Sequence, residues 1–158
     1  MACVIVVDDS PGVRAVLKTF LEIEGHHVIE AEDGEVVLGM PGLGPDDVVL
    51  LDVMMPKVDG FAVLAHLRRL GPESPRVIMC TARTGELDRQ KSLGLGAVGF
   101  LTKPFDVDEV AREIDLVLPQ SHEALSQRRD HEMYLSRLLH QLERATARGA
   151  HAGTSAEM

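Results

Sequence analysis

Charged and hydroxyl side chains recur where the short apolar runs of this sequence end. Asp8 and Asp9 follow the run "CVIVV", and Asp52 closes the run "VVLLD". Thr81 follows "VIMC", and Lys103 follows "GFLT". Short runs rich in Val, Ile and Leu are typical of strands buried on both faces. The sequence therefore predicts three carboxylates, one hydroxyl group and one ammonium group at strand ends.

This set of side chains favours phosphorus chemistry supported by a divalent cation. Carboxylates a few ångströms apart repel one another and have raised pKa values unless a cation compensates their charge. Oxygen ligands favour Mg²⁺, which needs one or two carboxylates and keeps positions for water and phosphoryl oxygens. Lys103 would supply a second positive charge. A carboxylate between these cations is a suitable nucleophile, because phosphoryl transfer depends on positioning and charge neutralisation.

Helical patterns alternate with the apolar runs. We predict strands at residues 3–7, 27–31, 48–52, 76–82 and 98–102. We predict helices at residues 11–25, 34–40, 60–71, 85–96 and 106–118. Such alternation indicates parallel pairing with right-handed crossovers and helices on both sheet faces. Ligands of these folds bind outside the carboxyl ends of the strands, where the charged residues fall.

Polar residues and glycines mark several helix ends. Ser10 is the predicted N-cap of the helix at 11–25, and Gly25 is its predicted stop. Asp106 is the predicted cap of the helix at 106–118. The helix at 34–40 is expected to be short, because breaker residues follow it.

Composition narrows the classes of function. The net charge of −9 disfavours direct nucleic-acid binding, which requires a basic face. No apolar run is long enough to span a membrane, and the start "MACVIVVDDS" does not resemble a signal peptide. Cys3 and Cys80 lie in apolar runs, as expected for reduced core thiols of a cytoplasmic protein.

Four segments carry a family resemblance when they are taken together. They are "VVDDSPGVRAVL", "VVLLDVMMPKVDGF", "VIMCTA" and "GFLTKPF". In this order and spacing they resemble the receiver domain of two-component response regulators, across about residues 2 to 118. The resemblance implies a flavodoxin-like α/β fold, a doubly wound sheet of five parallel strands in the order 2-1-3-4-5.

The resemblance also implies a phosphorylation site and a Mg²⁺ site. Asp52 corresponds to the phosphoacceptor and to one metal ligand. Asp9 corresponds to the acid that binds Mg²⁺ directly, and Asp8 acts mainly through water on the metal. The backbone carbonyl group of Met54 completes the implied set of protein ligands.

Further residues match the catalytic and switching positions of the family. Thr81 corresponds to the hydroxyl that moves to the phosphoryl group, and Lys103 to the cation that contacts it. Phe100 matches the switch aromatic, although an inward aromatic on this strand can also be a core residue. Pro104 would follow a cis peptide bond that helps to aim Lys103.

Three neighbouring positions are expected to modulate the lifetime of the phosphoryl group. Met54 and Arg83 lie two residues beyond Asp52 and Thr81, where they can flank the path of a hydrolytic water. Ala82 lies between Thr81 and Arg83 and belongs to the same set.

The implied function is that of a phosphorylation-controlled signalling protein. It would accept a phosphoryl group from a sensor histidine kinase or a phosphotransfer protein and catalyse only its own phosphorylation and dephosphorylation. Phosphorylation would shift the face formed by residues 85–96, 98–102 and 106–118 and change a protein contact. Alternatively, the chain is the regulatory part of a larger response regulator with an output domain. A haloacid-dehalogenase-like phosphatase is disfavoured, because no D-x-D follows the first strand.

The pattern changes after Pro119. We divide the chain into a receiver domain at 1–119, a C-terminal helix within 120–149 and a disordered tail at 150–158. The helix is predicted from about Ser121 to Arg148, with Gly149 as its stop. Its apolar stripe consists of Leu135, Leu138, Leu139 and Leu142. This stripe could pair with a second copy, dock on a partner or pack on the receiver; a homodimer could also form through the switching face.

Overall fold

The computed structural model describes residues 3–82, 86–118 and 122–152 of the chain. Its centre is a sheet of five parallel strands in the order β2-β1-β3-β4-β5. The strands are β1 (Cys3–Val7), β2 (His27–Ala31), β3 (Val48–Asp52), β4 (Arg76–Thr81) and β5 (Gly99–Thr102). The predicted α/β fold and its strand order are confirmed.

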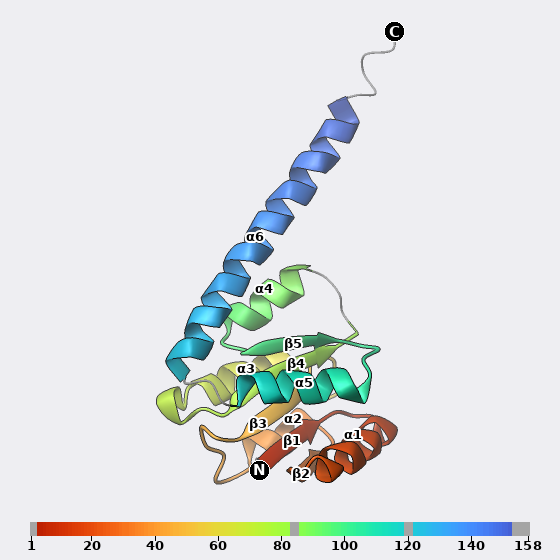
Figure 1. Cartoon of the computed structure of the whole chain (residues 1–158), viewed down its shortest axis with the longest axis vertical. Coiled ribbons are helices and arrows are strands. Elements are labelled where there is room, and N and C mark those ends of the chain that lie inside the picture. The colour runs from red at the N-terminus through yellow and green to blue at the C-terminus, as the bar shows by residue number, and fades with distance from the viewer. Residues whose placement is uncertain (1–2, 83–85, 119–121, 153–158) are drawn as a thin grey trace.

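Helices follow the strands along the described part of the chain (Figure 1). They are α1 (Pro11–Ile23), α2 (Gly34–Leu38), α3 (Gly60–Arg68), the short 3-10 helix η1 (Gly71–Glu73), α4 (Glu86–Gly94), α5 (Val107–Val117) and α6 (His122–Ala152). The predicted helix at 60–71 ends at Arg68, and Gly71, with its φ of 62°, begins η1 instead.

Different helices cover the two faces of the sheet. Val4 and Val6 of β1 pack in one apolar cluster with α1 and α5. Ile5 and Val7 pack in a second cluster with α2 and α3. Successive side chains of a strand point to opposite faces, so a strand covered on both sides needs a continuous apolar run. Asp52 and Thr81 are the last residues of β3 and β4, where the apolar runs end.

The predicted helix signals are confirmed at their residues. The amide of Val13 donates to the Ser10 hydroxyl at 3.3 Å, so Ser10 caps α1. Gly25 follows this helix with a φ of 94°, a conformation that glycine adopts without strain. The amide of Glu109 donates to the Asp106 carboxylate at 3.0 Å at the start of α5.

Gly60 allows α3 to approach the backbone at the end of β3. Its amide donates to the carbonyl oxygen of Val53 at 2.9 Å. A Cβ atom at this position would overlap the carbonyl oxygen of Asp52. Because Gly60 has no side chain, the loop that follows Asp52 can pack directly against the start of α3.

Helix α6 lies beside α4 and then continues away from the rest of the molecule (Figure 1). The helix passes through Gly149 to Ala152, so the prediction that Gly149 stops it is wrong. One exposed glycine between helix-forming residues costs only about 1 kcal/mol, which the neighbouring turns offset. The predicted disordered tail at 150–158 is thus helical to Ala152, and its residues 153–158 lie outside the described part.

The first half of α6 packs on the receiver, but not through the predicted leucine stripe. Leu125 is buried in the apolar cluster that includes α5. The predicted stripe is exposed and consists of Leu135, Leu138, Leu139 and Leu142. Homodimerisation through α6 or through the switching face stays a prediction. Among the described residues, no helix combines the length and the apolar character that a membrane span requires.

Candidate functional site

The three predicted carboxylates meet at the carboxyl edge of the sheet. Oxygen atoms of Asp8, Asp9 and Asp52 lie within 4.8 Å of one another. The register explains this, because Val7 of β1 pairs with Leu51 of β3 and each acid comes next in its chain. Asp8 and Asp52 are buried, whereas Asp9 is exposed. The cluster therefore combines two buried oxygen donors with one that faces solvent.

Lys103 lies between two of these acids. Its Nζ atom is 2.5 Å from Oδ2 of Asp8 and 3.2 Å from Oδ2 of Asp52. The amide of Lys103 donates to the carbonyl oxygen of Thr81 at 2.7 Å, which fixes the backbone from which the lysine extends. The peptide bond between Lys103 and Pro104 is cis, as the family resemblance implied.

Backbone groups orient the buried carboxylates. The amide of Ser10 donates to Oδ1 of Asp8 at 2.9 Å. The amide of Met54 donates to Oδ1 of Asp52 at 3.2 Å. Each buried acid thus receives a backbone donor on one oxygen and the lysine on the other. This double restraint leaves both carboxylates in fixed orientations at the edge of the sheet.

The charges of the site are strongly coupled. Burial raises the pKa of Asp52, the charge of Lys103 opposes this, and the charge of Asp8 raises the pKa again. Burial lowers the pKa of Lys103, but its hydrogen bond to Asp8 and the charge of Asp52 outweigh this and raise the pKa overall. The cluster contains three acidic groups and one lysine, so acidic groups are in excess. The oxygen donors and this excess of acidic groups fit a hard divalent cation such as Mg²⁺.

Thr81 and Phe100 occupy neighbouring strands. Thr81 is fully buried at the end of β4, directly after Cys80, which pairs with Asp52 of β3. Phe100 is half-buried on β5 and packs against the cluster of α3, with the guanidinium group of Arg89 5.8 Å from its ring centroid. Ala82 follows Thr81 and is exposed, whereas Arg83 lies outside the described residues.

Comparison with known proteins identifies the family. The sequence model described as "Response regulator receiver domain" matches residues 4–115. The chain belongs to the response regulator receiver family. The match ends before α6, so the long C-terminal helix is an addition to the receiver domain.

Curated relatives of this receiver domain include transcriptional regulators. The transcriptional regulatory protein CpxR of Escherichia coli K12 is 44% identical over 119 residues, which are 75% of this chain and 50% of that protein. The alkaline phosphatase synthesis transcriptional regulatory protein PhoP of Bacillus subtilis is 38% identical over 118 residues, which are 75% and 49%. The chain thus spans about half the length of the curated relatives it matches.

Solved structures confirm the receiver fold. The chemotaxis protein CheY4 of Vibrio cholerae aligns with a TM-score of 0.66 and 29% identity, over 75% of this chain and 99% of that chain. The response regulator TrrA of Thermotoga maritima, in complex with Mg²⁺–BeF, aligns with a TM-score of 0.64 and 31% identity, over 73% and 98%.

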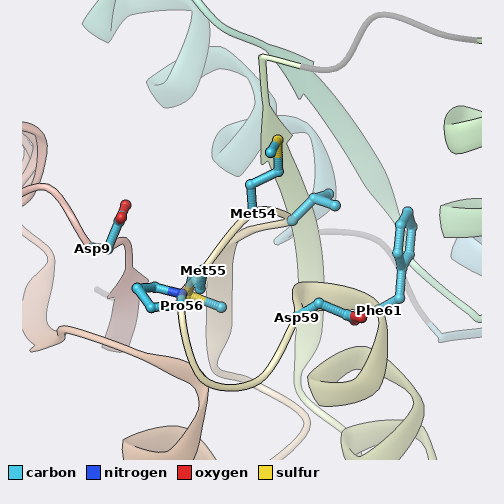
Figure 2. A pocket seen from close by; sticks show the side chains of 7 residues that line it. Asp9, Met54, Met55, Pro56, Asp59 and Phe61 are labelled. Carbon is cyan, nitrogen blue, oxygen red and sulfur yellow. The ribbon is translucent and has the colours of Figure 1, made fainter.

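A pocket of about 400 Å³ adjoins the acid cluster of the receiver domain (Figure 2). It is lined by Asp9, Val53, Met54, Met55, Pro56, Asp59 and Phe61. Met54 is 61% exposed, and in Figure 2 its side chain extends away from Pro56. Asp9 therefore has a largely apolar wall on one side, and Met54 is placed to affect what approaches the cluster.

Arg14 is a site residue that the sequence analysis missed. Its Nη1 atom donates to the backbone carbonyl oxygen of Asp8 at 2.6 Å. Its Nε atom lies 3.4 Å from Oε1 of Glu30 on β2. The arginine thus ties α1 to the ends of β1 and β2, beside the acid pair. Its position four residues after Ser10, on the turn that follows the N-cap, was the available signal.

Proposed function

We propose that this receiver domain accepts a phosphoryl group on Asp52 from a sensor histidine kinase or a phosphotransfer protein. The observation that supports this most is the buried Asp52 carboxylate, with Lys103 3.2 Å away and two further acids beside it. The single lysine contacts two of the three acids, Asp8 and Asp52, so the cluster holds more carboxylates than one ion pair requires. Membership of the response regulator family supports the same chemistry.

The cluster would hold Mg²⁺ during this reaction. Asp9, Asp52 and the backbone carbonyl group of Met54 would be its ligands, with Asp8 as an outer partner. When bound, the ion offsets the charge of the acids and of the phosphoryl oxygens. The structure of TrrA, a relative with the same fold, is a complex with Mg²⁺–BeF, which supports this assignment.

The proposed transfer is a substitution at phosphorus. A carboxylate oxygen of Asp52 attacks, and an oxygen–phosphorus bond forms while the phosphorus–nitrogen bond of a phosphohistidine breaks. The electron pair stays on the imidazole nitrogen, which can then take up a proton. In the later dephosphorylation water attacks phosphorus, and inorganic phosphate leaves while the carboxylate is regenerated. The domain thus acts only on its own side chain and is not an enzyme with a separate substrate.

Two residues of the chain would stabilise the phosphorylated form. Lys103 already contacts Asp8 and Asp52, so its ammonium group can move to a phosphoryl oxygen over a short distance. The hydroxyl group of Thr81 would donate a hydrogen bond to another phosphoryl oxygen. Both contacts are made to phosphoryl oxygens, whose negative charge is absent before the transfer. They therefore stabilise the phosphorylated state relative to the unphosphorylated one.

Met54, Ala82 and Arg83 would set the lifetime of the phosphoryl group. Met54 is exposed beside Asp9, where its side chain limits the approach of water to phosphorus. We expect Met54→Asn, and separately Arg83→Ala, to change the autodephosphorylation rate by about tenfold or less, measured as loss of the phosphorylated mass over time. Equal rates in both variants and the unmodified chain would remove this role.

A second candidate function follows from the relatives. CpxR and PhoP are transcriptional regulators of about twice the matched length, so this receiver could control an output domain in a longer protein. The mass of the protein isolated from its native cells separates the two proposals. A mass equal to that of the 158 residues favours a separate receiver, and a larger mass favours a regulatory region.

Incubation with a small-molecule phosphodonor tests the main proposal. The purified chain is treated with the donor in the presence of Mg²⁺, and its intact mass is measured. We expect a gain of one phosphoryl group, which chelation of Mg²⁺ or the substitution Asp52→Asn abolishes. A gain that persists in Asp52→Asn would refute the assignment.

A further inference from the structure

The start of α6 is anchored on α5. Leu125 is 2% exposed and belongs to the same apolar cluster as Val110 and Ile114 of α5. The Nη2 atom of Arg128 lies 3.0 Å from Oε1 of Glu113. One buried side chain and one ion pair therefore hold this end of the helix. Farther along, α6 contacts α4 instead (Figure 1).

Arg89 of α4 contacts both α6 and Phe100 of β5, which lies near Thr81; Phe100 and Thr81 are called the switch region below. Its Nη2 atom lies 2.8 Å from Oε2 of Glu132 on α6. Its guanidinium carbon lies 5.8 Å from the ring centroid of Phe100 on β5. Phe100 pairs with Met79 on β4, two residues before Thr81. One side chain thus contacts both the C-terminal helix and the strand that adjoins Thr81.

The contact between α4 and α6 also contains unsatisfied polar atoms. In the part of the chain that the structure describes, Nε2 of Gln90 on α4 is buried without a hydrogen-bond partner. On α6, the hydroxyl group of Ser136 is in the same situation. A buried polar group without a partner destabilises the state that buries it, because water would satisfy it in the open state. The docked arrangement of α6 is therefore weaker than its packing alone suggests.

Phosphorylation of Asp52 would act on this contact through the end of β4. Thr81 is buried there, and α4 is the next helix along the chain. A phosphoryl group on Asp52 would draw the Thr81 hydroxyl toward the site and so shift the end of β4 relative to α4. Arg89 then moves relative to Phe100 and Glu132. A weak contact can be opened by such a modest displacement.

We propose that phosphorylation of Asp52 breaks the Arg89–Glu132 ion pair and lets α6 pivot away from α4 about its anchor at Leu125. The inference rests on the proposed phosphorylation of Asp52 and adds the element that responds to it. In the unphosphorylated state α6 covers part of α4. In the phosphorylated state, the surface of α4 that α6 covered and the face of α6 that packed on α4 both become accessible to solvent.

Hydrogen–deuterium exchange measured by mass spectrometry tests this proposal on the full chain. The intact mass of each sample first reports phosphorylation. Exchange of the peptide covering residues 128–140 then reports docking, because a helix that loses its packing opens more often. We expect about fivefold faster exchange in this peptide after phosphorylation. Exchange of the sheet should not change.

Two matched substitutions separate the ion pair from general effects of charge. Glu132→Gln removes the partner of Arg89, and we expect about threefold faster exchange without any phosphodonor. Glu143→Gln makes the same chemical change on an exposed part of α6 and should leave this peptide unchanged.

The possible failures are distinguishable. A phosphorylated chain whose α6 exchange is unaltered would overturn this inference and leave the proposed function intact. Equal effects of Glu132→Gln and Glu143→Gln would also overturn it, because the ion pair would then have no specific role. A chain that gains no phosphoryl group would refute the proposed function and this inference with it.

Discussion

At the scale of single residues, Asp52 is a carboxylate whose burial affects the stability of the fold. Its side chain is buried at the end of β3 between one lysine and two further acids. Burial raises its pKa above the ordinary 3.8, Lys103 opposes this and Asp8 adds to it. When the pKa of an acid is higher in the folded than in the unfolded state, the folded chain becomes less stable as the pH rises past the unfolded pKa. The loss of stability is complete once the pH also exceeds the pKa of the folded state.

The substitution Asp52→Asn should therefore stabilise the chain when Mg²⁺ is absent. The amide keeps the size of the side chain and removes a buried charge, so we expect a gain of about 1 kcal/mol in the free energy of unfolding. Urea unfolding with a chelator at neutral pH measures it. The exposed Asp115→Asn serves as the control and should change nothing. An Asp52→Asn variant less stable than the unmodified chain would contradict this description of the site.

Cys80 provides a second prediction at this scale. Burial raises the pKa of its thiol from 9.0 to about 12. Between these values the unfolded state ionises the thiol and the folded state does not, so stability falls as the pH rises through this range. At neutral pH the native thiol should react with iodoacetamide far more slowly than that of Cys3, which is only partly buried. Equal labelling of the two cysteines without denaturant would show that Cys80 is accessible.

At the scale of elements, the close approach of α3 to β3 depends on Gly60. A Cβ atom there would overlap the backbone of Asp52, which cannot move without disturbing the site. We expect Gly60→Ala to destabilise the chain by about 2–3 kcal/mol and to weaken phosphorylation. Gly12→Ala is the matched control, because a Cβ atom at position 12 would lie 3.9 Å from its nearest neighbour, the Ser10 hydroxyl oxygen. Equal stability of the two variants by thermal unfolding would contradict a role for this contact.

Most elements could be predicted from the sequence, because buried strands and amphipathic helices produce periodic apolar patterns. The ends of the buried runs also place Asp8, Asp52 and Lys103 at one edge of the sheet, since parallel strands end on the same side. Helix ends were less predictable. Gly149 does not end α6, since a single glycine in an exposed helix is tolerated. Arg14 was missed because its contact with the Asp8 carbonyl depends on how α1 crosses β1.

At the scale of the whole molecule, the chain combines a receiver domain with one long helix. The receiver places its acid cluster at one edge of the sheet, and α6 packs on α4 and α5 (Figure 1). Arg89 is the described contact between the switch region and that helix. A chemical event at Asp52 can therefore reach α6 through a short series of contacts. Phosphorylation of Asp52 and the exchange of α6 must be measured on the same sample to show that one affects the other.

The central claim is that Asp52 is the side chain that receives phosphorus. An acyl phosphate is reduced by borohydride to an alcohol, which leaves homoserine in place of aspartate, and peptide mass mapping then locates the modified residue. After treatment with a phosphodonor and Mg²⁺, we expect homoserine at position 52 and unmodified aspartate at positions 8 and 9. Homoserine at either of those two positions, or a phosphorylated chain with Asp52 intact, would contradict the claim.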